Sequence, residues 1–384
     1  MLRLLPLYVV AFCGHAGFGL LFPVIPLYAE GLGASLPLIG VAVGAFSYAA
    51  ALTMIPFGML SDRLGRRGLM VVGLAMFTVA PLLYVWVQSP MQLILVRVFH
   101  GLASAAFIPP ANALVVDMSP PERRGEAIGW FTAAIMIGFI VGPVSGGFLL
   151  NCCGFNATFY ASSAASVLAL LLILPWLKGM AGKPEQAQAG DGFRAWLRQR
   201  RALGALVAVL FTVFGSGTIV AFLPLHGENI SVTASQVGII ITAIYASSAL
   251  LRAPAGILSD RIGREIVIVL GFVVSALSVA SFALLGSFSL FIVAGAAFGA
   301  GMGLAMTASF ALAADLASLN ARGLAMGASN SALQAGLGIG ATAMAGVAAA
   351  VGFESMFAIC GAILAAGVLV TFLLVRSPKR GVLR

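Results

Sequence analysis

The sequence has few charged residues for its length. Of its 384 residues, 9% are Asp, Glu, Lys or Arg and 61% are hydrophobic, whereas a water-soluble domain carries about 25% charged residues. So few charges cannot cover the water-facing surface of a chain this long, and most of the exterior must therefore face lipid. The composition excludes a soluble globular protein and predicts an integral membrane protein.

The sequence also lacks the residue spacings of enzymes and metal sites. The four cysteines, Cys13, Cys152, Cys153 and Cys360, do not have the spacing of a metal or redox centre, and we interpret them as small apolar residues. There is no Ser/His/Asp arrangement, and no glycine-rich loop is followed by Lys and Ser or Thr. We therefore expect no enzymatic activity, no metal and no cofactor.

Apolar runs long enough to cross a bilayer, about 20 residues at 1.5 Å per residue, recur along the whole chain. The first run is too long for the apolar core of a signal peptide, and Pro23 and Pro26 near its end do not fit a cleavage site. We expect it to stay in the membrane. Twelve runs are predicted to be transmembrane helices: 4–28, 38–60, 69–88, 91–116, 127–150, 156–177, 202–225, 236–258, 266–285, 288–314, 323–349 and 353–375.

The net charge of +9 reflects where the basic residues lie. All but two of the 21 Lys and Arg fall in alternate loops or near the chain ends, and the intervening loops contain only acidic charges, Glu30, Glu228 and Glu354. Basic residues collect on the cytoplasmic side of membrane proteins. Both termini are therefore expected in the cytoplasm, with the chain in the plasma (inner) membrane. The excess of positive charge therefore indicates which loops face the cytoplasm. It does not indicate a nucleic-acid partner, and we expect none.

The chain contains an internal repeat. Asp62 and Asp260 are 198 residues apart, and the same spacing relates residues 58–66 to 256–264 and many single positions. Two copies of a six-span unit in the same orientation imply an axis along the membrane normal, with a substrate site near the midplane between the copies. We predict an N-terminal six-helix bundle at 1–177, a cytoplasmic linker with an amphipathic segment on the inner leaflet at 178–201, and a C-terminal six-helix bundle with a short cytoplasmic tail at 202–384.

The loop after the second span reads Gly-Met-Leu-Ser-Asp-Arg-Leu-Gly-Arg-Arg from residue 58 and is copied at 256–264. It resembles the signature of the major facilitator superfamily, which implies an all-α integral membrane fold of twelve transmembrane helices in two pseudo-twofold-related six-helix bundles. Asp62 is expected to face the N-terminus of span 11, where the helix dipole favours an anion, and Arg63 or Arg66 to pair with Asp117. Ordinary topogenic charge is the alternative, but it does not explain two equivalent aspartates. The predicted conformational latch, which would favour the outward-open state, consists of Gly58, Asp62, Arg63, Gly65, Arg66 and Asp117 and, in the second copy, Asp260, Arg261, Arg264 and Asp315.

The fifth span contains a glycine-proline motif at 138–147. Glycines four residues apart form a smooth face for close helix packing, and a proline bends the span. The motif resembles the one associated with antiporters of the superfamily, which implies export, although packing alone is an alternative. Residues 17–26 and Arg97-Val-Phe-His100-Gly101 resemble patterns of the twelve-span drug:proton antiporters, with His100 in place of the usual glutamine. The motif residues are Gly138, Gly142, Pro143, Gly146 and Gly147.

Four ionisable residues lie inside the predicted spans: His15, Arg97, His100 and Arg252. A charge at the bilayer centre costs about 2.5–3.5 kcal/mol, so each is a candidate for binding substrate or protons. Interhelical hydrogen bonds are the alternative for the histidines, and snorkelling to the interface is the alternative for Arg252.

Acidic residues are missing from the interior of the spans, although many drug:proton antiporters carry an embedded acid for the coupling proton. A histidine titrates near pH 6.5 and is one candidate to carry that proton. The repeat-equivalent Glu30 and Glu228 at the outer mouth are a second possibility. An outer gate and simple solvation are equally good interpretations of these two glutamates.

Aromatic and methionine side chains are expected to line the cavity. Such a wall suits amphiphilic substrates, although lipid-facing packing explains any one of these residues equally well. The fixed charge of Arg97 favours neutral or anionic compounds over cations. The expected cavity residues are Phe18, Phe22, Phe107, Phe211, Phe214 and Met306.

These features predict a secondary active transporter with alternating access. Its leading function is proton-coupled efflux of amphiphilic small molecules. The alternatives are a flippase for a lipid-like substrate and a uniporter or symporter that imports a metabolite. A transport-inactive receptor or scaffold is a different class of function, which needs neither latch charges nor intramembrane His and Arg. The expected partners are a small-molecule substrate, protons and membrane lipids, and the expected oligomeric state is a monomer.

Overall fold

The structure is a computed structural model that describes residues 4–177, 190–318 and 321–375. Within these residues the chain is helical, with short turns and no strand. Residues 178–189 of the predicted linker and the predicted tail from 376 lie outside the described residues. The α-helices are α1 (Leu5–Gly19), α2 (Val24–Gly31), α3 (Leu36–Leu64), α4 (Arg66–Tyr84), α5 (Pro90–Asp117), α6 (Arg124–Leu177), α7 (Gly190–Leu197), α8 (Arg200–Asn229), α9 (Ala234–Ile262), α10 (Arg264–Ser281), α11 (Phe288–Asp315) and α12 (Arg322–Val375).

Ten helical segments of the described chain are long and apolar enough to cross a membrane, and α1 and α2 together form the first of them. Helices α6 and α12 are each 54 residues long, or about 80 Å, which is too long for one passage. Both break near their middle, at Gly154 and Gly352, where φ is 80° and 81°. Because α6 and α12 each provide two passages, the ten segments give the twelve predicted spans. The predicted all-helical membrane fold is confirmed.

Residues with positive φ recur at the 198-residue spacing of the sequence repeat. Besides the breaks in α6 and α12, α3 and α9 end at Gly65 and Gly263, with φ of 95° and 98°. Gly33, with φ of 78°, corresponds in the repeat to Ser231, with φ of 58°. Residues other than glycine seldom adopt positive φ, so the turn before α9 keeps the conformation of the turn before α3 even though its glycine has been replaced.

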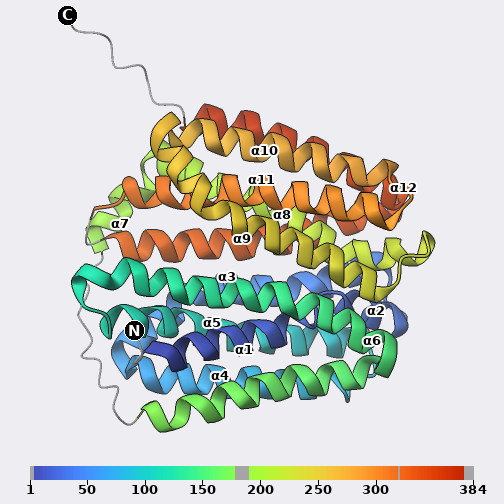
Figure 1. Ribbon diagram of the computed structural model, residues 1–384, viewed down its shortest axis with the longest axis horizontal. Helices are drawn as coiled ribbons and strands as arrows, with labels where there is room; N and C mark the ends of the chain where they lie inside the picture. The colour runs from blue at the N-terminus through green and yellow to red at the C-terminus, as the bar shows by residue number, and fades with distance from the viewer. Residues whose placement is uncertain (1–3, 178–189, 319–320, 376–384) are drawn as a thin grey trace, which may run out of the picture.

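The helices form two groups that follow the order of the chain. Figure 1 shows the blue-to-green elements below the yellow-to-red elements, with most helices side by side along the horizontal direction. Within the groups, α1 packs against α6 and α8 packs against α12; between them, α3 contacts α12 and α6 contacts α9. The bundle boundaries expected from the sequence stay a prediction.

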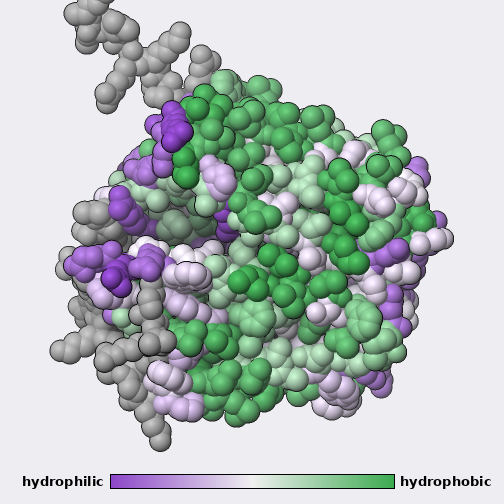
Figure 2. Space-filling view, viewed as in Figure 1, coloured by the Kyte–Doolittle hydropathy of each residue, from purple (hydrophilic) through white to green (hydrophobic). Residues whose placement is uncertain are grey.

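The distribution of surface residues suits a lipid environment. In Figure 2, hydrophobic residues cover the middle of the molecule, and hydrophilic residues gather at its left-hand and right-hand ends. Large apolar side chains such as Leu52, Leu250 and Leu284 are exposed on the helices. An apolar band between two polar ends is the surface that a membrane-spanning helical bundle requires.

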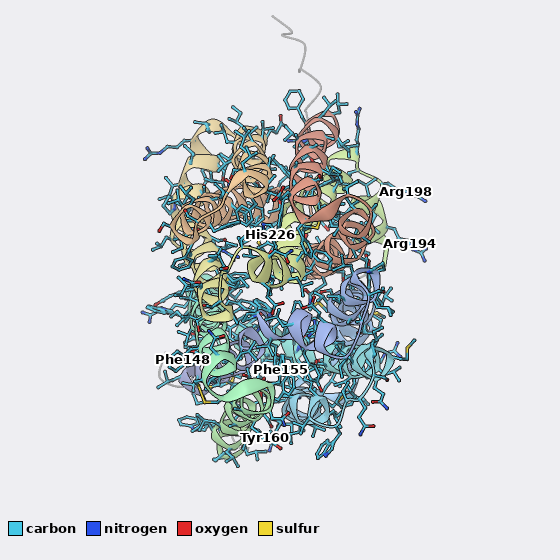
Figure 3. All side chains as sticks on the ribbon, turned by 90° about the vertical axis from the view of Figure 1, so that its right-hand side faces the viewer. Phe148, Phe155, Tyr160, Arg194, Arg198 and His226 are labelled. Atoms are coloured by element: carbon cyan, nitrogen blue, oxygen red, sulfur yellow. A yellow bond between two sulfur atoms is a disulfide. The ribbon has the colours of Figure 1, made fainter. Side chains whose placement is uncertain are left out.

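Helix α7 lies in the predicted linker and packs on the end of α11. Trp196 is buried, and its indole N–H donates to the carbonyl oxygen of Ala313 at 3.1 Å. Phe193 stacks on Trp196, whereas Arg194 and Arg198 point outward (Figure 3). The apolar face of α7 thus provides the last turn of α11 with a hydrogen-bond donor and a packing partner, and its place on the inner leaflet stays a prediction.

The four cysteines differ in exposure. Cys152 and Cys153 are adjacent and exposed next to the break at Gly154. Cys13 and Cys360 are buried free thiols, as expected of small apolar residues.

Candidate functional site

A cavity of about 2390 Å³ lies between the two groups of helices. Small-molecule pockets usually measure about 300–1,000 Å³, so this cavity has room for a ligand and for water. One of its ends reaches Arg63, Arg124 and Arg322, and we call this side of the molecule the arginine end. The opposite side, which carries Glu30 and Glu228, is called the glutamate end.

At the glutamate end the two groups of helices are in contact. The hydroxyl groups of Tyr48 on α3 and Thr342 on α12 are hydrogen-bonded at 2.6 Å. Thr242 on α9 donates to the carbonyl oxygen of Ile140 on α6 at 2.7 Å. The cavity is therefore open toward the arginine end and closed toward the glutamate end.

Two glycines allow this closure. A Cβ atom added to Gly238 would lie 2.3 Å from the carbonyl oxygen of Pro143 in the other half. A Cβ atom added to Gly40 would lie 2.6 Å from the carbonyl oxygen of Ala341, again in the other half. Gly40 and Gly238 are 198 residues apart, as are Pro143 and Ala341. The two closing contacts are thus repeat-equivalent, and only glycine permits so close an approach of the backbones.

The glycine-proline motif of α6 faces two directions. Gly138, Gly142 and Gly146 pack against α1, where added Cβ atoms would lie within 2.8 Å of backbone atoms. Gly147 instead meets α9, with 2.2 Å from an added Cβ to the carbonyl oxygen of Ala234, beside the contact made by Pro143. The motif therefore serves packing inside one half and contact between the halves at the same time.

Arg97 lies at the cavity wall but is held by protein groups. It is 5% exposed; its Nε donates to the carbonyl oxygen of Ala42 at 3.1 Å and an Nη donates to that of Val43 at 3.0 Å. Its guanidinium carbon lies 4.9 Å from the centre of the Phe46 ring, a cation–π distance. In the part of the chain that the structure describes, no carboxylate lies within 4.0 Å of Arg97. Arg97 thus braces α5 against α3.

The two candidate histidines differ in access to the cavity. His15 lines it, and its Nδ1 lies 2.8 Å from the carbonyl oxygen of Ala11. Because this contact requires a donor, Nδ1 carries the hydrogen and Nε2 is the basic nitrogen of the neutral ring. His100 is 0% exposed, is absent from the cavity wall, and has Nδ1 3.0 Å from the hydroxyl of Tyr84. Only His15 can therefore meet a ligand directly.

Arg252 lines the cavity instead of reaching the lipid interface, so the snorkelling interpretation is wrong. An Nη donates to the sulfur of Met306 at 3.5 Å, and its buried Nε has no hydrogen-bond partner among the described residues. A thioether is a weak acceptor. Unlike Arg97, Arg252 therefore donates to no carbonyl oxygen or carboxylate among the described residues.

The cavity wall differs in part from the sequence prediction. Phe18, Phe22, Phe107 and Met306 line it. Phe211 and Phe214 do not: the Phe211 ring packs against Gly367 of α12, and Phe214 is buried, with its backbone next to Gly340 of α12. The face of α8 toward the cavity instead carries Val213, Ser216, Gly217 and Val220, whose helical spacing of three and four residues turns the two phenylalanines away.

Sequence reasoning missed an aromatic floor between the halves. Tyr245 on α9 stacks on Phe139 of α6 at 5.2 Å between ring centres and lies 5.7 Å from Phe22. All three residues line the cavity. The signal that could have pointed to Tyr245 is its position seven residues before Arg252, on the same face of a helix.

The latch residues form one ion-pair cluster in each half. Arg66 pairs with Asp117 and, at 3.5 Å, with Asp62. Arg264 pairs with Asp260 at 2.6 Å and with Asp315 at 3.2 Å. Asp62 was expected to meet span 11 in the other half; it lines the cavity instead, because the cavity separates the halves at the arginine end.

The two clusters are expected to differ in strength. The side chains of Arg66 and Asp117 are 13% and 15% exposed, whereas Asp315 is 55% exposed. Breaking a buried pair costs about 3–5 kcal/mol and an exposed pair costs at most about 1 kcal/mol. We expect Asp117→Asn to lower the free energy of unfolding by about 3 kcal/mol, and the matched Asp315→Asn to lower it by less than about 1 kcal/mol. Chemical unfolding in mixed micelles measures both; equal losses would contradict the difference in burial.

Glu30 and Glu228 lie near each other across the two halves, at the ends of α2 and α8, which are in contact. Within the described chain, no group of three or more His, Cys, Asp or Glu side chains could hold a metal ion.

The comparisons with known proteins agree with this architecture. The family model of the Major Facilitator Superfamily matches residues 7–229 and 205–384. An uncharacterized MFS-type transporter of Methanocaldococcus jannaschii is 29% identical over 361 residues, covering 91% of this chain and 92% of the relative. Multidrug resistance protein MdtG of Klebsiella pneumoniae is 28% identical over 278 residues, covering 69% of this chain and 67% of the relative.

Solved structures share the fold at low sequence identity. A bacterial homolog of the human lysosomal transporter Spinster, in an inward-facing and occupied conformation, has a TM-score of 0.82 at 16% identity, covering 97% of this chain and 96% of that one. The nucleoside transporter NupG has a TM-score of 0.76 at 15% identity, covering 98% of this chain and 100% of that one.

Proposed function

The chain is a membrane transporter that belongs to the Major Facilitator Superfamily, and we propose that it exports amphiphilic small molecules, neutral or anionic in preference to cationic, in exchange for protons. The observation that carries this proposal is the character of the cavity. Six arginines and two aspartates line it, together with a wall of aromatic side chains. Aromatic walls favour apolar bodies, and an excess of positive charge disfavours cations.

The placement of the basic residues supports the proposed orientation in the membrane. The arginine end is assigned to the cytoplasm because basic loops face inward. The cavity then takes substrate from the cytoplasm and from the inner leaflet. The multidrug resistance protein of Klebsiella pneumoniae, similar over 69% of this chain, supports an exporter.

Alternating access requires the glutamate end to open. The repeat-equivalent contacts of Gly40 and Gly238 and the hydroxyl pair of Tyr48 and Thr342 must separate, and the arginine ends of the two halves then approach each other. We assign Glu30 and Glu228 to an outer gate at the glutamate end.

The proposed function is tested in an efflux-deficient bacterial host. Expression of the chain should raise the tolerated concentration of amphiphilic compounds, more for neutral and anionic compounds than for cations. Everted vesicles should take up the same compounds when acidified inside. Uptake that runs only into right-side-out cells would identify an importer, and movement of lipid probes alone would identify a flippase.

Proton coupling is expected to depend on the histidines. With Nδ1 committed to Ala11, the Nε2 of His15 is the basic nitrogen at the cavity wall. Replacing His15 and His100 together with Gln should abolish pH-driven exchange while counterflow of substrate continues. Substrate uptake with and without a pH gradient measures this in proteoliposomes. The matched Glu30→Gln/Glu228→Gln variant should keep pH-driven exchange; the reverse pattern would assign the proton to the outer glutamates.

A further inference from the structure

We propose that Arg252 binds the anionic head group of an amphiphilic substrate whose apolar body lies on the floor formed by Tyr245, Phe139 and Phe22. This inference rests on the proposed function and names the substrate class: an elongated amphiphile with one ionised group, such as a carboxylate, sulfonate or phosphate. It also assigns the main substrate charge to the C-terminal half rather than to Arg97.

The assignment of the head group to Arg252 rather than to Arg97 rests on the hydrogen-bond partners of the two arginines. A guanidinium group has five N–H donors. Arg97 uses donors on the carbonyl oxygens of Ala42 and Val43, and its plane lies against Phe46. Arg252 has the sulfur of Met306 and a buried Nε with no partner among the described residues. A cation with so few acceptors at a cavity wall is stabilised by any anion that enters.

Charge on the neighbouring wall does not compensate Arg252. In the described residues no Asp or Glu lies within 4.0 Å of its guanidinium group. The aspartates that line the cavity, Asp62 and Asp117, are both paired with Arg66 at the arginine end. An entering anion therefore meets Arg252 without having to displace a carboxylate.

The aromatic floor places the rest of the ligand. Tyr245 precedes Arg252 by seven residues, or about 10 Å along α9. It stacks on Phe139 and approaches Phe22, both in the N-terminal half. A ligand with its head on Arg252 and about eight methylenes of body would reach this floor, because extended carbon chains add about 1.25 Å per methylene, comparable to the 1.5 Å rise of a helix. Such a ligand contacts both halves at once.

Position 252 also breaks the internal repeat. The equivalent residue of the first half is Met54, which lines the cavity as well. The arginine is thus present on one side of the chamber only. At this position, an anion would find a guanidinium group on α9 and the apolar side chain of Met54 on α3.

The test compares two probes that differ only in charge: a dansyl-labelled dodecanesulfonate and the corresponding dansyl-labelled dodecanesulfonamide, each titrated by fluorescence into the full-length protein in nanodiscs. Arg252→Gln should weaken sulfonate binding about ten- to hundredfold, the range for a charge-assisted hydrogen bond, and change sulfonamide binding less than about twofold. Arg252→Lys keeps the charge and should lose less than Arg252→Gln. Phe139→Ala should weaken both probes equally, because it removes only an apolar contact of the floor.

The control variant is Arg67→Gln, which removes an exposed arginine that does not line the cavity and should leave both affinities within about twofold. Equal weakening of both probes by Arg252→Gln, or no weakening, would overturn the assignment while leaving the proposed function standing. If the wild-type protein binds neither probe, the amphiphile exporter itself is refuted, and this inference falls with it. Thermal unfolding of each variant shows whether a lost affinity reflects a lost fold.

Discussion

Replacing Arg97 with lysine is expected to abolish transport of charged and neutral substrates alike. The guanidinium fork of Arg97 holds the carbonyl oxygens of Ala42 and Val43 and stacks against Phe46, and a lysine cannot make two divergent hydrogen bonds and a planar contact together. A buried acceptor left without a partner costs about 1–3 kcal/mol. Because 1.4 kcal/mol corresponds to a factor of ten, the brace between α3 and α5 should weaken about five- to hundredfold.

Initial transport rates of the sulfonate and sulfonamide probes in proteoliposomes measure this effect. Both rates should fall by the same factor in Arg97→Lys, whereas Arg252→Lys should lower the sulfonate rate alone. Selective loss of the sulfonate in Arg97→Lys would show that Arg97, and not Arg252, carries the substrate charge. The two lysine variants thus control for each other, since both keep the net charge of the cavity.

Adding a side chain at Gly238 is expected to open the glutamate end. The Cβ of a valine at this position would lie 2.3 Å from the carbonyl oxygen of Pro143 across the two halves, so the closed contact cannot form without a backbone shift. Overpacking costs about 1–3 kcal/mol, which changes the ratio of the two conformations about five- to hundredfold. Gly40→Val should act in the same way through Ala341.

Spin labels at positions 63 and 322, which lie at the cavity mouth in opposite halves, report the conformation. Their separation should shorten in Gly238→Val, because the arginine end closes when the glutamate end opens. The control is Gly346→Val on α12, where an added Cβ has no atom within 4 Å. An unchanged distance distribution in Gly238→Val would show that the halves do not rock about this contact.

The latch shows how far spacing alone can predict a contact. From the sequence, either of two arginines in each half could pair with the aspartate. In the structure the pairing residues are Arg66 and Arg264, which follow the turn glycines Gly65 and Gly263. Their place at the first position of α4 and α10 turns them toward the helix ends that carry Asp117 and Asp315. The sequence could not select between them, because a glycine with positive φ redirects the chain.

The residues that line the cavity could not all be predicted from the sequence. Phe211 and Phe214 belong to a span correctly expected beside the cavity, yet neither lines it, and the Phe211 ring packs against α12. Tyr245 was not expected and lies on the cavity floor. Helical periodicity tells which residues share a face but not which neighbour that face meets, so an aromatic residue in a wholly apolar span cannot be assigned from the sequence.

The sequence by itself determined that this chain lies in a membrane, crosses it twelve times and is built from two copies of one unit, because scarce charge, apolar run length and a constant spacing of 198 residues are properties of the chain alone. Only the tertiary structure decided that the cavity is open at the arginine end, that His100 is hidden while His15 is accessible, and that Arg252 faces the cavity rather than lipid. Each of these depends on the rotation and separation of helices from distant parts of the chain. Those quantities come from packing between the two halves, which no single span encodes.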